Sequence, residues 1–260
     1  MIRSLWTAAT GMSAQQVNMD VIANNLANAN TTGFKRGRAN FEDLMYQTLA
    51  APGSETSSNG QLPTGIQIGM GARNVSIQRN QDQGEFTQTS NQLDLAIEGK
   101  GFFKVMQGSN EVYTRSGAFK LDKDGYIVDS GGNRLQPEIS VPTNATTVTI
   151  ESGGTLTATD QSGNTLASGT INLYDFQNTG GLLSLGHNYY QPSQASGDAV
   201  EGQPGVDGFG TILQGYLENS NINVVEEMVS MIVGQRAYEA NSKVIKTSDE
   251  MLQMANNVKA

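Results

Sequence analysis

The sequence predicts an α+β fold, in which helices at the two ends of the chain pair with each other and an all-β domain of short antiparallel strands is inserted between them. Two ladders of apolar residues at seven-residue steps predict the helices, and a long central stretch of alternating apolar and polar residues predicts the strands. The 30 glycines and the hydrophobic fraction of only 37% imply many turns and strand edges.

The N-terminal helix is predicted over residues 3–28, with Ser4 as its cap, and is expected to end in the polar run 28–33. Apolar residues seven apart form one continuous stripe along a helix. The N-terminal ladder consists of Leu5, Met12, Met19 and Leu26.

The C-terminal helix is predicted from Asn223 to about Asn256, and Asn223 with Glu226 three residues later forms a candidate capping box. The C-terminal ladder consists of Val224, Met231, Tyr238, Ile245 and Leu252. A lone helix with an exposed apolar stripe is not stable in water. Each ladder therefore needs the other, or the ladders of further copies of the chain, and the nine ladder residues are predicted polymerisation contacts.

Two segments after the first helix are expected to differ from each other. Helical spacing of four apolar residues suggests a second short helix within residues 34–50. These residues are Phe41, Leu44, Met45 and Leu49. Residues 51–60 combine Pro, Gly, Ser and Asn and are expected to form a loop.

Period-two alternation begins at Ile66 and continues to about Tyr190, as is typical of half-buried strands. Glycine- and asparagine-containing runs interrupt it and predict hairpin turns. These runs are 123–125, 130–133, 152–154 and 160–164. Residues 193–210 are expected to be a loop. The predicted domains are a helical domain of residues 1–45 plus 211–260, an extended connector of residues 46–69, and an outer all-β domain of residues 70–210.

Charge and composition limit the function classes. The net charge of −9 is concentrated in the middle of the chain, whereas both ends are nearly neutral. Near-neutral ends can pack against copies of themselves, and an acidic middle argues against nucleic acid as a partner. The chain has no cysteine, no apolar run long enough for a membrane span, and no apolar stretch near its start resembling a cleavable signal peptide.

Candidate catalytic and metal-binding patterns are weak. His187 is the only histidine, and its neighbours suggest a turn that enters a strand rather than a metal site or triad. Residues 122–125 have the glycine at the wrong position for a calcium loop and suggest a β-turn. Residues 99–101 precede a strand, not the helix start that a phosphate loop needs.

Two further patterns have residue types that occur in binding or catalytic sites. Lys35, Arg36 and Arg38 form a basic cluster that is too small for nucleic acid and more consistent with the end of a packed helical region. Two of the acids in the middle of the chain could act as a glycosidase pair, but nothing in the sequence selects two of them. The sequence therefore predicts no catalytic residue, no cofactor and no metal ligand.

Three sequence runs resemble the bacterial flagellar axial proteins, the rod and hook families. The run 23–35 resembles the N-terminal signature of these families, and the run 220–243 resembles their C-terminal signature. A third, weaker match joins residues 101–105 with residues 113–119 of the β-domain. The motif residues are Asn24, Asn25, Leu26, Ala27, Asn28, Thr32, Gly33, Phe34, Lys35, Asn221, Asn223, Glu226, Gln235, Arg236 and Tyr238.

Within this family the chain is most similar to the distal rod. Its length and the segment 46–69 carry this likeness, because the segment resembles an extra loop by which the distal rod differs from the hook. In that family the loop is thought to bridge neighbouring subunits and stiffen the rod. The residues expected to act in this way are Leu62, Pro63, Gly65, Ile66 and Ile68.

The resemblance implies a structural subunit of the distal rod that polymerises into a stiff hollow drive shaft around the export channel. It implies a helical homopolymer as the first partner, with proximal rod proteins, hook protein, P-ring and L-ring proteins, the rod cap and the flagellar type III export apparatus as further partners. The expected location is the basal body from periplasm to outer membrane, reached without signal cleavage. Alternatives are the hook or a proximal rod protein, or a peptidoglycan-processing enzyme.

Overall fold

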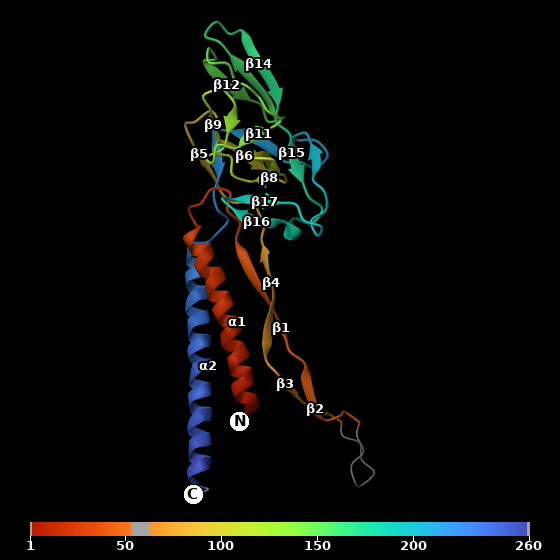
Figure 1. The fold of residues 1–260 in the computed structure, drawn as a ribbon, viewed down its shortest axis with the longest axis vertical. Coiled ribbons are helices and arrows are strands. Elements are labelled where there is room, and N and C mark those ends of the chain that lie inside the picture. The colour runs from red at the N-terminus through yellow and green to blue at the C-terminus, as the bar shows by residue number, and fades with distance from the viewer. Residues whose placement is uncertain (1, 54–62, 259–260) are drawn as a thin grey trace. The chain divides into compact units, whose positions relative to one another are not determined.

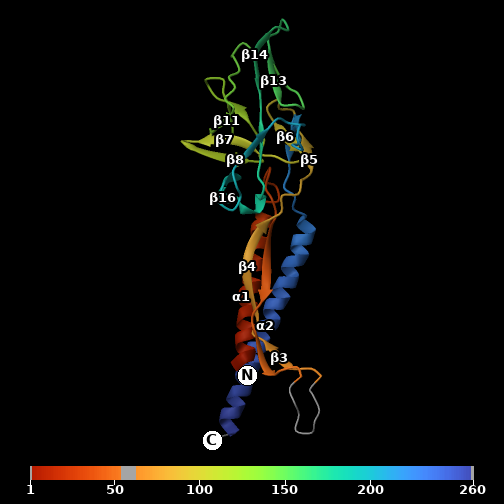
Figure 2. The same ribbon diagram turned by 90° about the vertical axis from the view of Figure 1, so that its right-hand side faces the viewer.

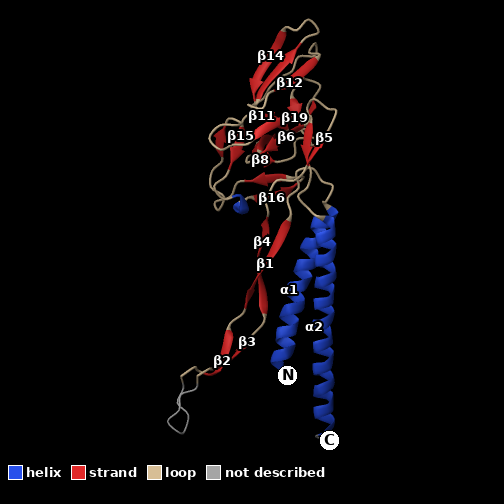
Figure 3. Ribbon diagram, turned by 180° about the vertical axis from the view of Figure 1, so that it is seen from behind, coloured by secondary structure: helices blue, strands red, loops and turns tan. Residues whose placement is uncertain are grey.

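A computed structural model describes residues 2–53 and 63–258 and confirms the predicted α+β fold, with two long helices and an intervening set of small β-sheets (Figures 1 and 3). The first helix, α1, spans Ile2–Ala27, and the second, α2, spans Val224–Val258. A short 3-10 helix, η1, spans Thr179–Gly181. No helix in the described part of the chain is long and apolar enough to cross a membrane.

The helix ends follow local capping chemistry. Asn223 Oδ1 accepts hydrogen bonds from the backbone N–H groups of Val225 (3.1 Å) and Glu226 (3.4 Å), which confirms Asn223 as the N-cap of α2. The predicted cap of α1 is wrong: α1 already includes Ile2, so Ser4 lies inside the helix, where its Oγ faces Ser248 Oγ at 3.5 Å.

The chain forms two compact units. One contains residues 1–27, 37–78 and 223–260, and the other contains residues 28–36 and 79–222. We call them the helical unit and the β unit. This division differs from the predicted domain boundaries: the segments 28–36 and 211–222 group with the β-strands, and the segment 46–78, which includes the predicted connector, groups with the helices.

The helical unit combines α1 and α2 with four strands. These are β1 (Gly37–Asp43), β2 (Tyr46–Ala50), β3 (Ile66–Gly69) and β4 (Ala72–Arg79, whose last residue belongs to the β unit). Strand β1 pairs with β4, β2 pairs with β3, and β1 packs along α1 (Figure 2). The two helices lie side by side and antiparallel, as the contact between Ser4 and Ser248 at one end and between Asn25 and Glu227 at the other requires.

The short helix predicted within residues 34–50 is wrong, because this region forms β1 and β2. Four apolar residues over nine positions fit either a helical or an extended chain when no long periodic pattern decides between them. Here the strand partners decide: Tyr46 pairs with Gly69 and Thr48 with Gln67, about twenty residues further along the chain. The predicted loop 51–60 lies largely outside the described residues.

The β unit is built from strands β5 to β20. The first eight are β5 (Phe86–Gln88), β6 (Leu95–Glu98), β7 (Phe103–Gln107), β8 (Asn110–Thr114), β9 (Lys120–Leu121), β10 (Ile127–Val128), β11 (Arg134–Gln136) and β12 (Thr147–Ile150). The others are β13 (Thr155–Thr159), β14 (Thr165–Thr170), β15 (Leu173–Asp175), β16 (Leu183–Gly186), β17 (Tyr189–Gln191), β18 (Val200–Gly202), β19 (Thr211–Gln214) and β20 (Tyr216–Glu218). Strand β18 lies within the region predicted as a loop, and strands continue well past Tyr190.

A seven-stranded sheet with the order β16-β17-β8-β7-β11-β10-β9 forms the largest layer of the β unit. A three-stranded sheet, β12-β13-β14, and the pairs β15-β18, β19-β6 and β20-β5 complete it (Figure 1). The predicted hairpin turns are confirmed, and each contains a glycine with positive φ. These are Gly125 (79°), Gly132 (79°), Gly154 (82°) and Gly163 (80°).

Two hydrophobic clusters stabilise the β unit. The larger contains Phe103 and Phe119, whose rings meet edge to face at 5.3 Å, together with aliphatic residues from many strands. The smaller is aromatic and consists of Phe102, Tyr113, Tyr174, Phe176 and Tyr190. A core of this size gives the β unit its own basis for stability, independent of the helices.

Candidate functional site

The contact between α1 and α2 contains a row of small and polar residues, and the ladder residue Met19 lies against it. Asn25 Nδ2 donates a hydrogen bond to Glu227 Oε2 (3.2 Å). A Cβ added to Gly11 would lie 2.9 Å from Asn241 Nδ2, and one added to Gly234 would lie 3.5 Å from Met19 Cγ. We name this row the polar seam, and it consists of Ser4, Gly11, Asn18 and Asn25 on α1 and Glu227, Gly234, Asn241 and Ser248 on α2.

Both helices supply the polar seam at seven-residue steps, so it follows the same period as the ladders. On α1 it runs one position before the ladder of Leu5, Met12, Met19 and Leu26, all of which are half-buried. On α2 the ladder residues Met231 and Ile245 are half-buried, whereas Val224, Tyr238 and Leu252 are exposed. The ladders therefore flank the helix contact. A heptad row of small and polar residues was visible in the sequence, but it lacks the apolar character by which seams are usually recognised.

A second apolar surface covers the first three turns of α2. It consists of Val225, Met228, Val229, Ile232 and Val233, which are between 51% and 69% exposed, and we name it the outer patch. At 100° per residue these side chains lie on the face of α2 opposite Glu227 and Gly234. Further along the helix the same face carries Arg236, Glu239 and Lys243. Adjacent exposed apolar side chains of this kind mark interaction surfaces, so this face of α2 has the composition of an interface.

Asn25 connects the start of β1 to α1 through both atoms of its amide. Its Oδ1 accepts from the backbone N–H of Gly37 (2.9 Å), and its Nδ2 donates to the carbonyl oxygen of Gly37 (2.8 Å). Asn25 is only 2% exposed, so these bonds satisfy a buried polar group. Asn25, a residue of the N-terminal motif, therefore holds Gly37 beside α1.

The β unit contains a buried ionic cluster of Lys35, Arg115 and Glu218, which we name the junction triad. Lys35 Nζ lies 2.7 Å from Glu218 Oε1, and Arg115 Nε lies 2.7 Å from Glu218 Oε2. The side chains of Lys35 and Glu218 are each 1% exposed, and that of Arg115 is 5% exposed. The basic residue Lys35, which the sequence placed with Arg36 and Arg38 at the end of a packed helical region, thus belongs to a buried ionic cluster with Arg115 and Glu218.

Backbone groups satisfy the remaining polar atoms of the junction triad. Arg115 donates to the carbonyl oxygens of Gly101 (2.6 Å), Ile97 (3.1 Å) and Gly99 (2.5 Å). Lys35 Nζ also donates to the carbonyl oxygen of Asp82 (2.7 Å), and the N–H of Gly84 donates to Glu218 Oε1 (3.0 Å). Buried charges are tolerated only when they are paired and hydrogen-bonded in this way. The run 99–101 is thus an anchor for Arg115 and not a phosphate loop.

The protonation states of the triad follow from its surroundings. Burial raises the pKa of the Glu218 carboxyl, but the charges of Arg115 and Lys35 outweigh burial and hold that pKa below its ordinary value. Burial lowers the pKa of the Lys35 amino group, and Glu218 offsets this only in part. The lowered pKa of Lys35 disfavours the charged ion pair, whereas the lowered pKa of Glu218 favours it. The lowered pKa of Glu218 decides the state of the cluster, because this carboxylate faces two cations at once.

Other motif residues fix the chain around the triad. Asn221 Oδ1 accepts from the N–H of Arg36 (2.8 Å), and its Nδ2 donates to the carbonyl oxygens of Asn80 (3.0 Å) and Asp82 (2.9 Å). Gly33 has φ of +70°, and a Cβ there would lie 2.7 Å from the backbone nitrogen of Ser116. Only glycine fits this position without strain.

The remaining predicted site residues are more dispersed. Phe34 is buried with the guanidinium of Arg79 5.3 Å above its ring, and the carbonyl oxygen of Thr32 accepts from Asn188 Nδ2 (3.0 Å). Motif residues exposed on the helices are Asn24, Ala27, Gln235 and Arg236, and Asn28 begins the turn after α1.

The predicted stiffening segment is a two-stranded ribbon in the part that is described. Ile66 and Ile68 lie on β3 opposite Ala50 and Gln47 of β2, and Ile66 is exposed. Gly65 permits the close approach of β2, since a Cβ there would lie 2.5 Å from the carbonyl oxygen of Ala50. Pro63 is exposed, and Leu62 lies outside the described residues.

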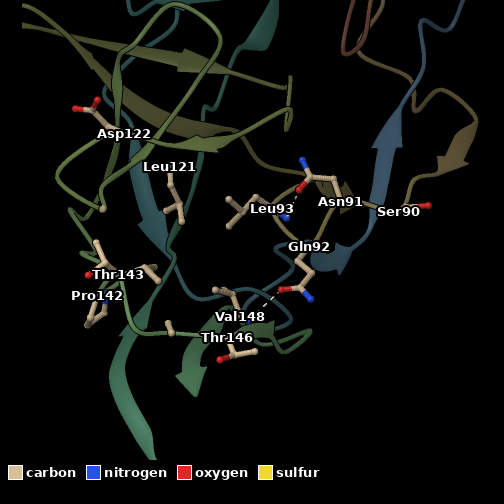
Figure 4. A pocket seen from close by; sticks show the side chains of 13 residues that line it. Ser90, Asn91, Gln92, Leu93, Leu121, Asp122, Pro142, Thr143, Thr146 and Val148 are labelled. Carbon is tan, nitrogen blue, oxygen red and sulfur yellow. Dashed lines mark hydrogen bonds between the residues drawn. The ribbon is translucent and has the colours of Figure 1, made fainter. Parts of the chain in front are cut away.

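Two cavities of the β unit are lined mainly by hydroxyl, amide and aliphatic groups. One, of about 430 Å³, contains Asp122 as its single carboxylate, and Gln92 Oε1 accepts from the N–H of Val148 (3.1 Å) at its edge (Figure 4). The other, of about 520 Å³, contains His187 and Asp129. Neither brings two carboxylates together, and the described residues include no group of three or more metal-ligating side chains. Residues 122–125 form the predicted β-turn, with the N–H of Gly125 donating to Asp122 O (2.9 Å).

Family models match three parts of the chain. Residues 5–35 match the model described as flagella basal body rod protein, residues 96–158 match the flagellar hook protein FlgE/F/G D1 domain, and residues 213–258 match the flagellar basal body rod FlgEFG protein C-terminal model. Over its full length the chain is similar to the flagellar basal-body rod protein FlgG of Buchnera aphidicola from Acyrthosiphon pisum, with 50% identity covering 97% of this chain and 98% of the relative. The chain belongs to the flagellar basal-body rod protein family.

Two further relatives agree. The chain is 46% identical to FlgG of Caulobacter vibrioides, with both chains covered completely, and 45% identical to FlgG of Borreliella burgdorferi, covering 100% of this chain and 99% of the relative. The flagellar rod protein is thus a structural subunit of the basal-body rod, as the resemblance implied, and these relatives favour the rod over the hook. The junction triad takes one residue from each matched segment: Lys35 from the first, Arg115 from the second and Glu218 from the third.

Proposed function

We propose that this rod protein polymerises through its terminal helices into the distal rod, a stiff hollow shaft that encloses the export channel and transmits motor torque to the hook. The outer patch of α2 carries this proposal. Five large apolar side chains more than half exposed in the subunit need a cover in water, and a second copy of the chain supplies apolar ladders of matching period. The polar seam and Met19 are used within the subunit, so the outer patch and the exposed ladder residues of α2 remain for contacts between subunits.

A charge placed in the outer patch tests the proposal. Ile232→Asp changes an exposed residue, so the free energy of unfolding of the monomer should change by less than about 1 kcal/mol. In a subunit interface the same charge would be buried without a partner, which costs several kcal/mol. We expect normal soluble protein but no rods in purified basal bodies seen by electron microscopy.

Asn256→Asp, an exposed amide-to-acid change near the end of the same helix, is the matched control and should give normal rods. If Ile232→Asp cells built rods in normal number, the outer patch would not be a subunit contact.

We also propose that the segment 46–69 stiffens the rod by contacting neighbouring subunits, with proximal rod proteins, hook protein and the P and L rings as the other partners between periplasm and outer membrane. The exposed apolar residues of the β2–β3 ribbon, Tyr46, Leu49 and Ile66, support this role. Deleting the segment should give rods that assemble but bend in electron micrographs. Straight rods after the deletion would contradict the proposal.

We further propose a structural role without enzymatic activity. The support is that each described cavity contains one carboxylate, whereas glycoside hydrolysis uses two placed across the scissile bond. A zymogram with peptidoglycan in the gel tests this directly. A cleared band at the position of the purified chain would show that it is an enzyme.

A further inference from the structure

The chain passes between its two units four times, after residues 27, 36, 78 and 222. On the side of the β unit these passages belong to only three short segments: 28–36, 79–85 and 218–222. Any force carried by the chain from one unit to the other must therefore pass through these three segments.

The three segments are joined to one another by backbone hydrogen bonds. The N–H of Gly33 donates to the carbonyl oxygen of Glu218 (2.8 Å), and the N–H of Asn219 donates to that of Glu85 (2.8 Å). The N–H of Asn80 donates to the carbonyl oxygen of Arg36 (2.8 Å). The segment 218–222 thus contacts both of the others.

Side chains from 218–222 reinforce each of these contacts. Glu218 binds Lys35 of the first segment and the N–H of Gly84 in the second, and Arg115 attaches the same carboxylate to the loop after β6. Asn221 binds Arg36 of the first segment and the carbonyl oxygens of Asn80 and Asp82 in the second. Charge-assisted bonds in a site closed to water are strong and directional, so they resist both separation and twisting.

We propose that the junction triad, with Asn221, is a torsional lock that holds the three connecting segments at a fixed relative orientation when the rod carries torque. Glu218 is its central positioning residue, because its two carboxylate oxygens bind groups from three parts of the chain. This inference rests on the proposed function, since only a subunit that transmits torque needs such a lock. A merely stabilising ion cluster would contribute to folding but not to the response of the rod to load.

Hydrogen exchange on the full-length monomer tests the local part of the proposal. Glu218→Gln keeps the shape of the side chain but removes the charge that Lys35 and Arg115 share. We expect amides of residues 33–36 and 80–85 to exchange at least tenfold faster, while those of β12–β14 do not change. Glu111→Gln is the matched control, because Glu111 forms a 2.8 Å ion pair with Lys104 but is half exposed. It should leave the exchange of both regions unchanged.

Swimming cells test the mechanical part. In cells whose rods contain Glu218→Gln, we expect a normal number of basal bodies but a loss of at least half the swimming speed in viscous medium, with little loss in dilute buffer. Glu111→Gln cells should match the wild type in both media. If Glu218→Gln prevents folding, Asn221→Ala replaces it, since that change leaves the junction triad intact and should also slow cells selectively under load.

The outcomes separate this inference from the proposed function. Loosened amides in rods whose speed under load equals that of the wild type would overturn the torsional lock and leave the rod function standing. Unchanged exchange in both variants would overturn it as well. If cells that lack the chain entirely still built complete rods, the proposed function itself would fail.

Discussion

At the scale of single residues, two buried polar side chains, Asn25 of the N-terminal motif and Glu218 of the junction triad, each make several hydrogen bonds or ion pairs. Asn25 binds both backbone groups of Gly37 and the carboxylate of Glu227, and Glu218 binds two cations and a backbone N–H. A buried polar group contributes little net stability when it is satisfied but costs far more when one partner is lost. Asn25 and Glu218 therefore each favour one arrangement of the surrounding chain, and small changes in their side chains should lower the stability of the fold strongly.

Asn25→Asp is expected to destabilise the helical unit. The change keeps the size of the side chain but replaces the amide donor with a carboxylate, about 3 Å from that of Glu227, and removes the bond to the Gly37 carbonyl oxygen. Loss of a buried donor together with like-charge repulsion should cost about 2–4 kcal/mol. Gln16→Glu makes a similar amide-to-acid change at an exposed position of the same helix and should cost less than about 0.5 kcal/mol. Equal unfolding curves for the two variants would show that Asn25 is not essential.

The stability of the β unit should depend on pH through Glu218. The cations beside it outweigh burial and hold the pKa of Glu218 in the folded state below its ordinary value, so ionised Glu218 stabilises the fold. This contribution is complete above the pKa of the unfolded carboxyl and is lost as pH falls through the lower folded value. Urea midpoints measured from pH 7 down to pH 3 should therefore fall more steeply for the wild type than for Glu218→Gln. Parallel curves would show that protonation of Glu218 does not govern acid unfolding.

At the scale of helices, strands and turns, the sequence predicts the features that depend on residues close by in the chain. The two helices, the Asn223 cap and the glycine-containing hairpin turns depend on residues close by in the chain, and the structure confirms them, although it begins α1 before the predicted cap Ser4. Strands β1 and β2 lie where the sequence predicts a helix, because their conformation is decided by partners much further along the chain.

The candidate site was predictable only in part, for the same reason. The motif indicated that Lys35 matters, but not that it meets Glu218, which is 183 positions away. Arg115 appeared only as part of a weaker family match. The polar seam was missed because apolar character, not small size, was used to find helix contacts. Small residues mark a contact just as well when two helices approach closely.

Substitutions at Gly234 test how closely α1 and α2 pack. A methyl group at this position would meet Met19 Cγ at 3.5 Å, an ordinary contact, so Gly234→Ala should stabilise α2 by about 0.5–1 kcal/mol through its better helix propensity. Gly234→Leu must push the helices apart and should destabilise the pair by about 1–3 kcal/mol. Thermal unfolding followed by circular dichroism would measure both. Equal effects of Ala and Leu would mean that Gly234 does not lie in a close contact.

At the scale of the whole molecule, the two units differ in what stabilises them. The β unit has a buried core of aliphatic and aromatic side chains, with a second, aromatic cluster and a paired ionic triad. On its two helices the helical unit has a polar seam, only a few buried apolar residues (Ala8, Ala14, Val21 and Ile22), and many exposed apolar residues on α2. Since apolar burial is the main source of stability, the helices should depend on neighbouring subunits far more than the β unit does.

Hydrogen exchange should therefore distinguish the units when monomer and assembled rod are compared. Amides of the first three turns of α2 should exchange at least a hundredfold more slowly in the rod, if neighbouring copies cover the outer patch there as we propose. Amides of β7 and β8, at the centre of the seven-stranded sheet, should be equally protected in both states and provide the internal control. If α2 were as protected in the monomer as in the rod, the polar seam alone would stabilise the helices. The exposed apolar side chains of α2 would then need another explanation.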